Sequence, residues 1–151
     1  MTTIKTTQNR HSLTQLGFTL IEILIVVAII GILGAIAAIG YQVQVRKTQL
    51  MIVYQEMNYF RLPYQTLMNE GAGVTDFSPN GLNMPEQTKY CQFSVIAPNT
   101  NGTTANAIVC QIQNLSYLES QSISLDRATD GSWQCRVSAG IPKAYLPKGC
   151  Q

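Results

Sequence analysis

The chain has 151 residues, of which 46% are hydrophobic, and a formal net charge of +2 at pH 7. Lys5 and Arg10 precede Gly17, so the ten Lys and Arg of the whole chain leave eight after it, against eight Asp and Glu. This balance excludes the strong positive surplus of a dedicated nucleic-acid-binding domain, although a local basic patch fits within a neutral total. The length allows one domain of ordinary size.

The first predicted element is an apolar helix over residues 17–39, in which the only charged side chain is that of Glu22. About 20 apolar residues are enough to span a bilayer as a helix. A carboxylate near the bilayer centre costs ~2.5–3.5 kcal/mol on insertion scales, so its presence indicates a function. Glu22 needs a cationic partner, which the run lacks and which a new amino terminus just upstream would supply.

Two ordinary interpretations compete for this segment. A secretory signal would use Lys5 and Arg10 as its basic region and Ala35-Ile36-Ala37 as its cleavage site, but its apolar region would exceed the usual 7–15 residues. A plain membrane anchor explains the length and leaves Glu22 without a reason. If the apolar segment stays in the membrane, the basic residues before it predict a cytoplasmic N-terminus and outward-facing residues after about 41. Arg46 and Lys47 weaken this asymmetry without reversing it.

The helix is predicted to continue to residue 69 as an amphipathic segment. Beyond Tyr41, apolar residues recur at alternating steps of three and four and form one stripe: Leu50, Val53, Met57, Phe60, Tyr64 and Leu67. Pro63 predicts a kink near residues 59–63, and two separate helices broken at Pro63 are the alternative. Gly71-Ala72-Gly73 is expected to end the helix, because glycine accepts the left-handed conformation of a C-cap.

Residues 71–88 are rich in Gly, Pro, Asp and Asn and are predicted to form a loop. Four segments with alternating apolar residues follow and are predicted to be strands: 90–97, 107–113, 122–127 and 132–137. Asp130-Gly131 is a strong hairpin turn before the last of them. The expected fold class is α+β, with a long N-terminal helix packed on a four-stranded antiparallel sheet.

The four cysteines predict two disulfides and an oxidising compartment, with three possible pairings. Cys91 and Cys110 fall on the buried face of one predicted hairpin, and Cys135 and Cys150 bracket the loop 136–149. Strand geometry therefore favours the pairs Cys91–Cys110 and Cys135–Cys150. Closing a loop of the second size stabilises by ~3 kcal/mol in the chain-entropy model.

The stretch Gly17-Phe18-Thr19-Leu20-Ile21-Glu22 closely resembles the class III signal of type IV prepilins. The resemblance implies that a membrane aspartyl peptidase cleaves between Gly17 and Phe18 and methylates the new terminus at Phe18. It also implies that Glu22 pairs with the N-terminal amine during assembly, with Thr19 part of the same motif. This interpretation retains the apolar segment and places a free amine near Glu22.

The C-terminal loop, from Cys135 through Pro142, Pro147 and Cys150, closely resembles the disulfide-bounded D-region of type IVa major pilins. In relatives this loop is an exposed filament surface often implicated in adhesion. Lys143, Tyr145 and Lys148 are the residues that could contact a negatively charged ligand, DNA included. The alternative is that they are solvated loop residues, with Tyr145 packing the loop.

Two features depart from the family pattern. The leader of 17 residues is long for a type IVa pilin, and Ile39 stands where the family usually has proline. In filaments of relatives, the segment between the glycine matching Gly31 and that proline loses helicity. Gly31, Gly34 and Gly40 each weaken a helix by about 1 kcal/mol relative to alanine, so local melting stays possible without proline.

The sequence carries no pattern typical of an enzyme. The only histidine, His11, lies in the leader, and no nucleophile–base set, P-loop or dinucleotide-binding turn is present. Asp126 and Asp130 resemble calcium ligands of some relatives but are more typical of turn formers. We expect no catalytic residue, cofactor or metal.

Together these features predict a structural subunit of a type IV pilus. Residues 1–17 are a leader, 18–41 a membrane and filament-core helix, and 42–151 the outer helix half with a globular head. The expected partners are copies of the chain, the prepilin peptidase, the inner-membrane assembly machinery, and a host surface or DNA. The chain would sit in the bacterial inner membrane and then in an extracellular pilus serving adhesion, twitching motility or DNA uptake. The alternatives are a minor or competence pilin that binds DNA through its C-terminal loop, and a secretion-system pseudopilin.

Overall fold

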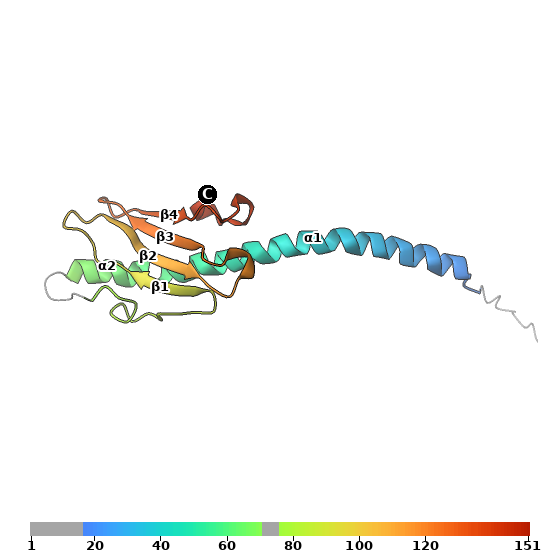
Figure 1. Cartoon of the computed structure of the whole chain (residues 1–151), viewed down its shortest axis with the longest axis horizontal. Helices are drawn as coiled ribbons and strands as arrows, with labels where there is room; N and C mark the ends of the chain where they lie inside the picture. Colours follow the sequence, from blue (N-terminus) through green and yellow to red (C-terminus); the bar gives the residue numbers. More distant parts are fainter. Residues whose placement is uncertain (1–16, 71–75) are drawn as a thin grey trace, which may run out of the picture. The chain divides into compact units, whose positions relative to one another are not determined.

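A computed structural model describes residues 17–70 and 76–151 (Figure 1). It contains two helices, α1 (Leu20–Tyr59) and α2 (Arg61–Glu70), followed by four strands. The chain divides between Ile39 and Gly40 into two compact units, which we describe separately. The expected leader lies outside the described residues except for Gly17, and so does the expected helix end at 71–73.

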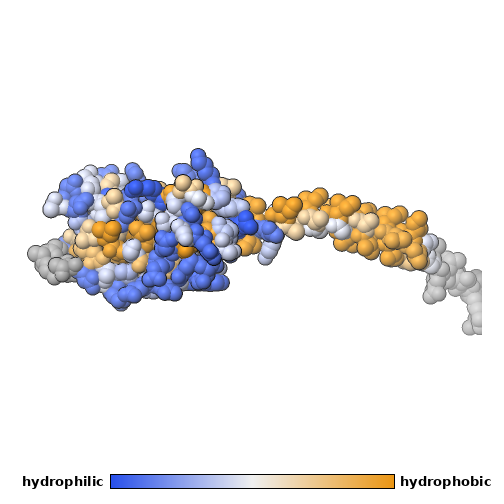
Figure 2. All heavy atoms as spheres, viewed as in Figure 1, coloured by the Kyte–Doolittle hydropathy of each residue, from blue (hydrophilic) through white to orange (hydrophobic). Residues whose placement is uncertain are grey.

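The N-terminal unit presents an apolar helical surface without cover. Every described residue of this unit is exposed, and the apolar character of the helix is visible over its length in Figure 2. By length and composition, this helix qualifies as a membrane span. It stays helical through Gly31 and Gly34 in the single chain, whereas loss of helicity in a filament remains a prediction.

The helix breaks at Phe60, inside the predicted interval. Pro63 has no N–H to donate to the carbonyl of Tyr59, and its ring crowds that carbonyl, so α1 ends at Tyr59 and α2 begins afresh at Arg61. The amide of Phe60 instead donates to the oxygen of Met57 at 3.2 Å. The interruption falls at the single residue Phe60, inside the interval of the predicted kink. Pro63 itself lies within α2, so the alternative of two helices broken at Pro63 is not what the structure has.

The predicted stripe forms the helical side of the core. Leu50, Val53, Met57, Phe60 and Tyr64 are buried, and Leu67 packs at the margin. Phe60 lies 4.6 Å from Phe93 between ring centroids, which joins the helix to the sheet. The amphipathic period of the sequence thus predicts which face of the helix the sheet covers.

The sheet is antiparallel, in the order β1-β2-β3-β4, with strands Cys91–Val95, Thr104–Ile112, Ser122–Arg127 and Trp133–Val137. Three of the four predicted ranges match closely, but β2 begins three residues before the predicted start at 107. A register shift between Thr104 and Ile108 accounts for the difference. Asn106 has a φ of 54°, and its amide donates to Asp126 Oδ1, so the strict alternation that marks a strand is interrupted there.

Tyr64 is the most enclosed polar side chain on the helical stripe. Its hydroxyl donates to the carbonyl of Ile96 at 2.8 Å and lies 3.2 Å from Thr104 Oγ1. Its ring meets Trp133 edge-on at 5.4 Å. Burial raises the pKa of the Tyr64 phenol above its ordinary value of 10.0.

Both expected disulfides are present. Cys91–Cys110 joins β1 to β2 with a Cα–Cα distance of 5.2 Å, and Cys135–Cys150 joins β4 to the C-terminal loop at 4.8 Å. Cys91 and Cys110 lie diagonally, since Cys110 is paired with Phe93 in the ladder. Their shared inward face, predicted from the alternation, is what brings them together.

Leu125→Ala should lower the free energy of unfolding of the head by about 2–5 kcal/mol, because Leu125 is fully buried and the change leaves a cavity. Denaturant unfolding in detergent, followed by fluorescence of the single tryptophan, measures this. The matched control is Leu62→Ala, at a side chain that is 76% exposed. It should change stability by less than about 0.5 kcal/mol. Equal effects of the two changes would contradict the assigned core.

The raised pKa of Tyr64 predicts alkaline destabilisation. The folded state keeps a phenolic proton that the unfolded chain releases, so this contribution is fully present below pH 10.0 and is lost as the pH rises through the folded value. Tyr64→Phe should flatten the decline of unfolding free energy with pH in that range, measured by the same assay. Tyr59→Phe, at an exposed ring, should keep the wild-type slope. A decline unchanged by Tyr64→Phe would refute this origin.

Candidate assembly site and C-terminal loop

The beginning of α1 is capped by Thr19. Its carbonyl accepts from the amides of Glu22 at 3.1 Å and Ile23 at 3.4 Å, and its Oγ1 accepts from the Glu22 amide at 3.3 Å. A threonine followed three residues later by glutamate has the spacing of a capping box. The T-x-x-E spacing in the sequence could have predicted this cap. Thr19 was interpreted above only as part of the prepilin motif.

Glu22 therefore lies in the first turn of the helix, where a negative charge is favourable. A helix N-terminus carries the equivalent of about +0.5 charge. Within the described part of the chain, the carboxylate of Glu22 forms no ion pair, since the only one found joins Arg136 to Asp126. A role of Glu22 in assembly stays a prediction.

The bond between Gly17 and Phe18 precedes the helix. Both residues are exposed, and a Cβ built on Gly17 would meet no atom of the described residues within 4 Å. Because the helical hydrogen bonds begin at Thr19, this peptide bond lies outside regular secondary structure. Cleavage at this bond stays a prediction.

The C-terminal loop is fastened to α1 by close packing. The backbone at Gly149 lies so near the Tyr54 hydroxyl that any side chain there would collide with it. Cys150 is buried and bonded to β4, and Leu146 is buried in the same cluster. Short 3₁₀ turns at Lys143–Tyr145 and Lys148–Cys150 connect these fixed points.

Tyr145 is one of these packing contacts. Its hydroxyl accepts from Arg46 Nη1 at 3.0 Å, and Arg46 also lies over the ring of Tyr117, 4.7 Å from its centroid. Tyr117 in turn donates to Gln49 at 2.7 Å, and burial raises its pKa. The structure therefore favours the packing interpretation of Tyr145. No sequence pattern signals this contact, because Arg46 and Tyr145 are 99 residues apart.

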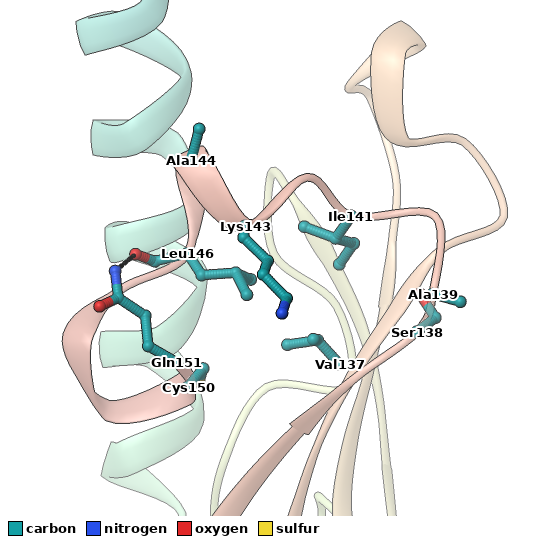
Figure 3. Close-up of a pocket in the computed structure, with 9 residues that line it drawn as sticks. All are labelled: Val137, Ser138, Ala139, Ile141, Lys143, Ala144, Leu146, Cys150 and Gln151. Atoms are coloured by element: carbon teal, nitrogen blue, oxygen red, sulfur yellow. Dashed lines mark hydrogen bonds between the residues drawn. The ribbon is translucent and has the colours of Figure 1, made fainter.

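Lys143 and Lys148 are both exposed but line different pockets. Lys143 borders a pocket of about 630 Å³ whose other walls include Val137, Ile141 and Leu146 (Figure 3). Lys148 borders a second pocket of about 330 Å³ together with Lys47 of α1. The structure thus brings Tyr145 and Lys148 to one pocket and Lys143 to the other, and the two pockets share the wall residues Ala144, Leu146 and Gln151.

The carboxylates considered for calcium have other partners. Asp126 pairs with Arg136 and accepts from the Asn106 amide, while Asp130 accepts from the Ser132 amide at 2.9 Å. The hydrogen bonds from Ser132 lower the pKa of Asp130. Over residues 17–70 and 76–151, no group of three or more possible metal ligands gathers.

Two family models match this chain, one over its N-terminal segment and one over most of the remaining residues. A family model described as pilin, a bacterial filament protein, matches residues 47–151. A model of the prokaryotic N-terminal methylation motif matches residues 13–38, which include Gly17, Phe18 and Glu22.

Several relatives match over most of their length. A probable minor fimbrial protein of Dichelobacter nodosus is 32% identical, over 89% of this chain and 94% of its own. A fimbrial protein of Pseudomonas aeruginosa is 30% identical, over 88% and 92%. A type IV major alpha-pilin of Moraxella bovis is 29% identical, over 90% and 96%. The chain belongs to the pilin family of bacterial filament proteins and carries the N-terminal methylation motif.

Proposed function

We propose that this chain is a structural subunit of a type IV pilus. It is cleaved between Gly17 and Phe18, held in the inner membrane by residues 18–41, and then packed with its copies into a filament. The observation that carries the proposal is an uncovered apolar helix whose capped first turn holds one carboxylate with no ion-pair partner among residues 17–70 and 76–151.

The apolar surface requires a cover. From Phe18 to Ile39 the large side chains are exposed, with Leu20 at 80% and Ile39 at 72%. Soluble monomers rarely expose contiguous apolar patches beyond a few hundred Å². Lipid supplies the cover before assembly, and the same surfaces of neighbouring copies supply it afterwards. The basic leader residues Lys5 and Arg10 support a cytoplasmic N-terminus in the membrane stage.

Cleavage would supply a cationic partner for the carboxylate of Glu22. It creates an α-amine on Phe18, one residue before the Thr19 cap, where the helix end is already partly positive. A second positive charge is unfavourable there and favours a nearby carboxylate. In the filament, the Glu22 carboxylate of one subunit would meet the methylated Phe18 amine of an adjacent one.

A DNA-binding competence pilin and a secretion pseudopilin are less well supported. Of the three residues expected to contact DNA, Tyr145 is engaged by Arg46, and Lys143 and Lys148 line different pockets. The relatives include proteins named as minor and as major fimbrial subunits. Adhesion and twitching motility are the uses that we propose for the assembled filament.

Gly17→Ser should prevent processing, because a side chain at this position adds atoms at the bond that the peptidase must accept. A Cβ at Gly17 touches none of the residues that the structure describes, so the fold of the head should be unaffected. Mass spectrometry of the membrane fraction should find the leader retained, whereas wild-type sheared filaments should begin with methylated Phe18. Processed, methylated Gly17→Ser protein would refute the assigned cleavage site.

Glu22→Gln should reduce sheared filaments at least about tenfold, because it leaves the buried amine of an adjacent subunit without a counter-charge. Glutamine is also accepted at this position of a capping box, so the change removes the charge and preserves the cap. Glu22→Val should fail equally.

The matched control is Thr19→Ala. It removes the cap, at a cost of about 0.5–2 kcal/mol of helix stability, and keeps the carboxylate. It should retain more filaments than Glu22→Gln in the same shearing assay. Normal assembly of Glu22→Gln together with failure of Thr19→Ala would assign the role of this site to capping alone.

A further inference from the structure

A groove of about 330 Å³ lies between the outer half of α1 and the C-terminal loop. Lys47 and Lys148 line it from the two sides, and both side chains are exposed. Met51, Leu146 and Pro147 supply apolar walls. The groove thus combines two cations with an apolar surface, which suits an amphipathic anion.

The charge of this groove is uncompensated within the described residues. Neither residues 40–55 of the helix nor residues 138–151 of the loop contain an acidic side chain. Among the described residues, neither lysine forms an ion pair with a carboxylate. Lysine binds phosphate as a point charge, so a groove lined by two lysines suits a phosphate group.

The groove is close to the apolar segment in the sequence. Lys47 follows Ile39, the last residue of that segment, by eight residues. Tyr41, an aromatic residue of the kind enriched at membrane–water interfaces, stands between them in the sequence. Basic side chains next to a span are attracted by anionic lipid headgroups.

Cations at this place run against the ordinary charge bias of membrane proteins. Lys and Arg are enriched in cytoplasmic segments, whereas Lys47 follows the span on its outward side. A basic side chain near an anionic membrane surface gains attraction from it. Binding of a lipid would explain why Lys47 lies on the outward side of the span, where basic residues are less frequent.

We propose that this groove binds the headgroup phosphate of an anionic phospholipid in the outward-facing leaflet. Lys47 and Lys148 contact the phosphate, and Met51 and Leu146 pack against the glycerol and upper acyl carbons. The proposal rests on the membrane-held stage of the proposed function. It assigns to that stage a lipid contact that ties the C-terminal loop to the membrane surface.

The test places the full chain in nanodiscs that contain equal amounts of phosphatidylglycerol and phosphatidylcholine. Native mass spectrometry then measures the fraction of released chains that retain each lipid. Wild-type chain should retain phosphatidylglycerol preferentially. Lys47→Gln with Lys148→Gln should reduce that retention about tenfold or more, since each cation near the surface contributes to binding.

The matched control is Lys89→Gln with Lys143→Gln, which removes the same charge at exposed lysines outside the groove. It should retain phosphatidylglycerol within about twofold of wild type. Near-UV circular dichroism of both double variants verifies that the head is folded. Equal loss in the control, or no preference of wild-type chain for the anionic lipid, overturns the proposal.

Two further measurements distinguish the lipid site from a DNA site and from a failure of membrane insertion. A duplex DNA oligonucleotide that binds wild-type chain and is lost only with Lys47→Gln and Lys148→Gln, while lipid retention is unchanged, overturns the lipid assignment in favour of DNA. Failure of wild-type chain to enter nanodiscs contradicts the membrane stage itself. Entry without selective retention contradicts the lipid site alone.

Discussion

One helical stripe serves as the base on which the head is built. Leu50, Val53, Met57, Phe60 and Tyr64 are covered by the inward face of the sheet, and α1 and α2 are the only α-helices within the described residues. The segment from Leu20 to Ile39 has no such cover. α1 is therefore a core helix of the head over one part of its length and exposes an apolar surface over another.

Periodic features of this chain could be predicted from sequence because they depend on one element at a time. The spacing of apolar residues along the chain predicts the helical stripe and the inward residues of the strands. It also predicts the disulfide between Cys91 and Cys110. The start of β2 was missed because the bulge at Asn106 breaks the alternation. The break at Phe60 follows from the carbonyl that Pro63 crowds, which lies a turn before the proline itself.

The candidate sites divide along the same line. Gly17, Phe18 and Glu22 form a local motif and are recognisable from their order, whereas the packing of Arg46 between Tyr117 and Tyr145 depends on three distant segments meeting. Lys47 and Lys148 line the same groove, which also depends on two distant segments meeting. From the sequence, Arg46 and Lys47 bear only on the charge asymmetry across the span, because the residues near them in space come from distant parts of the chain.

The C-terminal loop alternates between positions that the fold holds and positions that it leaves free. Leu146, Gly149 and Cys150 are fixed by packing, close approach and the disulfide, while Lys143 and Lys148 are exposed where they line two pockets. Substitutions at the exposed positions therefore leave the anchors intact. The exposed chemistry of the loop can therefore be changed by design with little effect on folding.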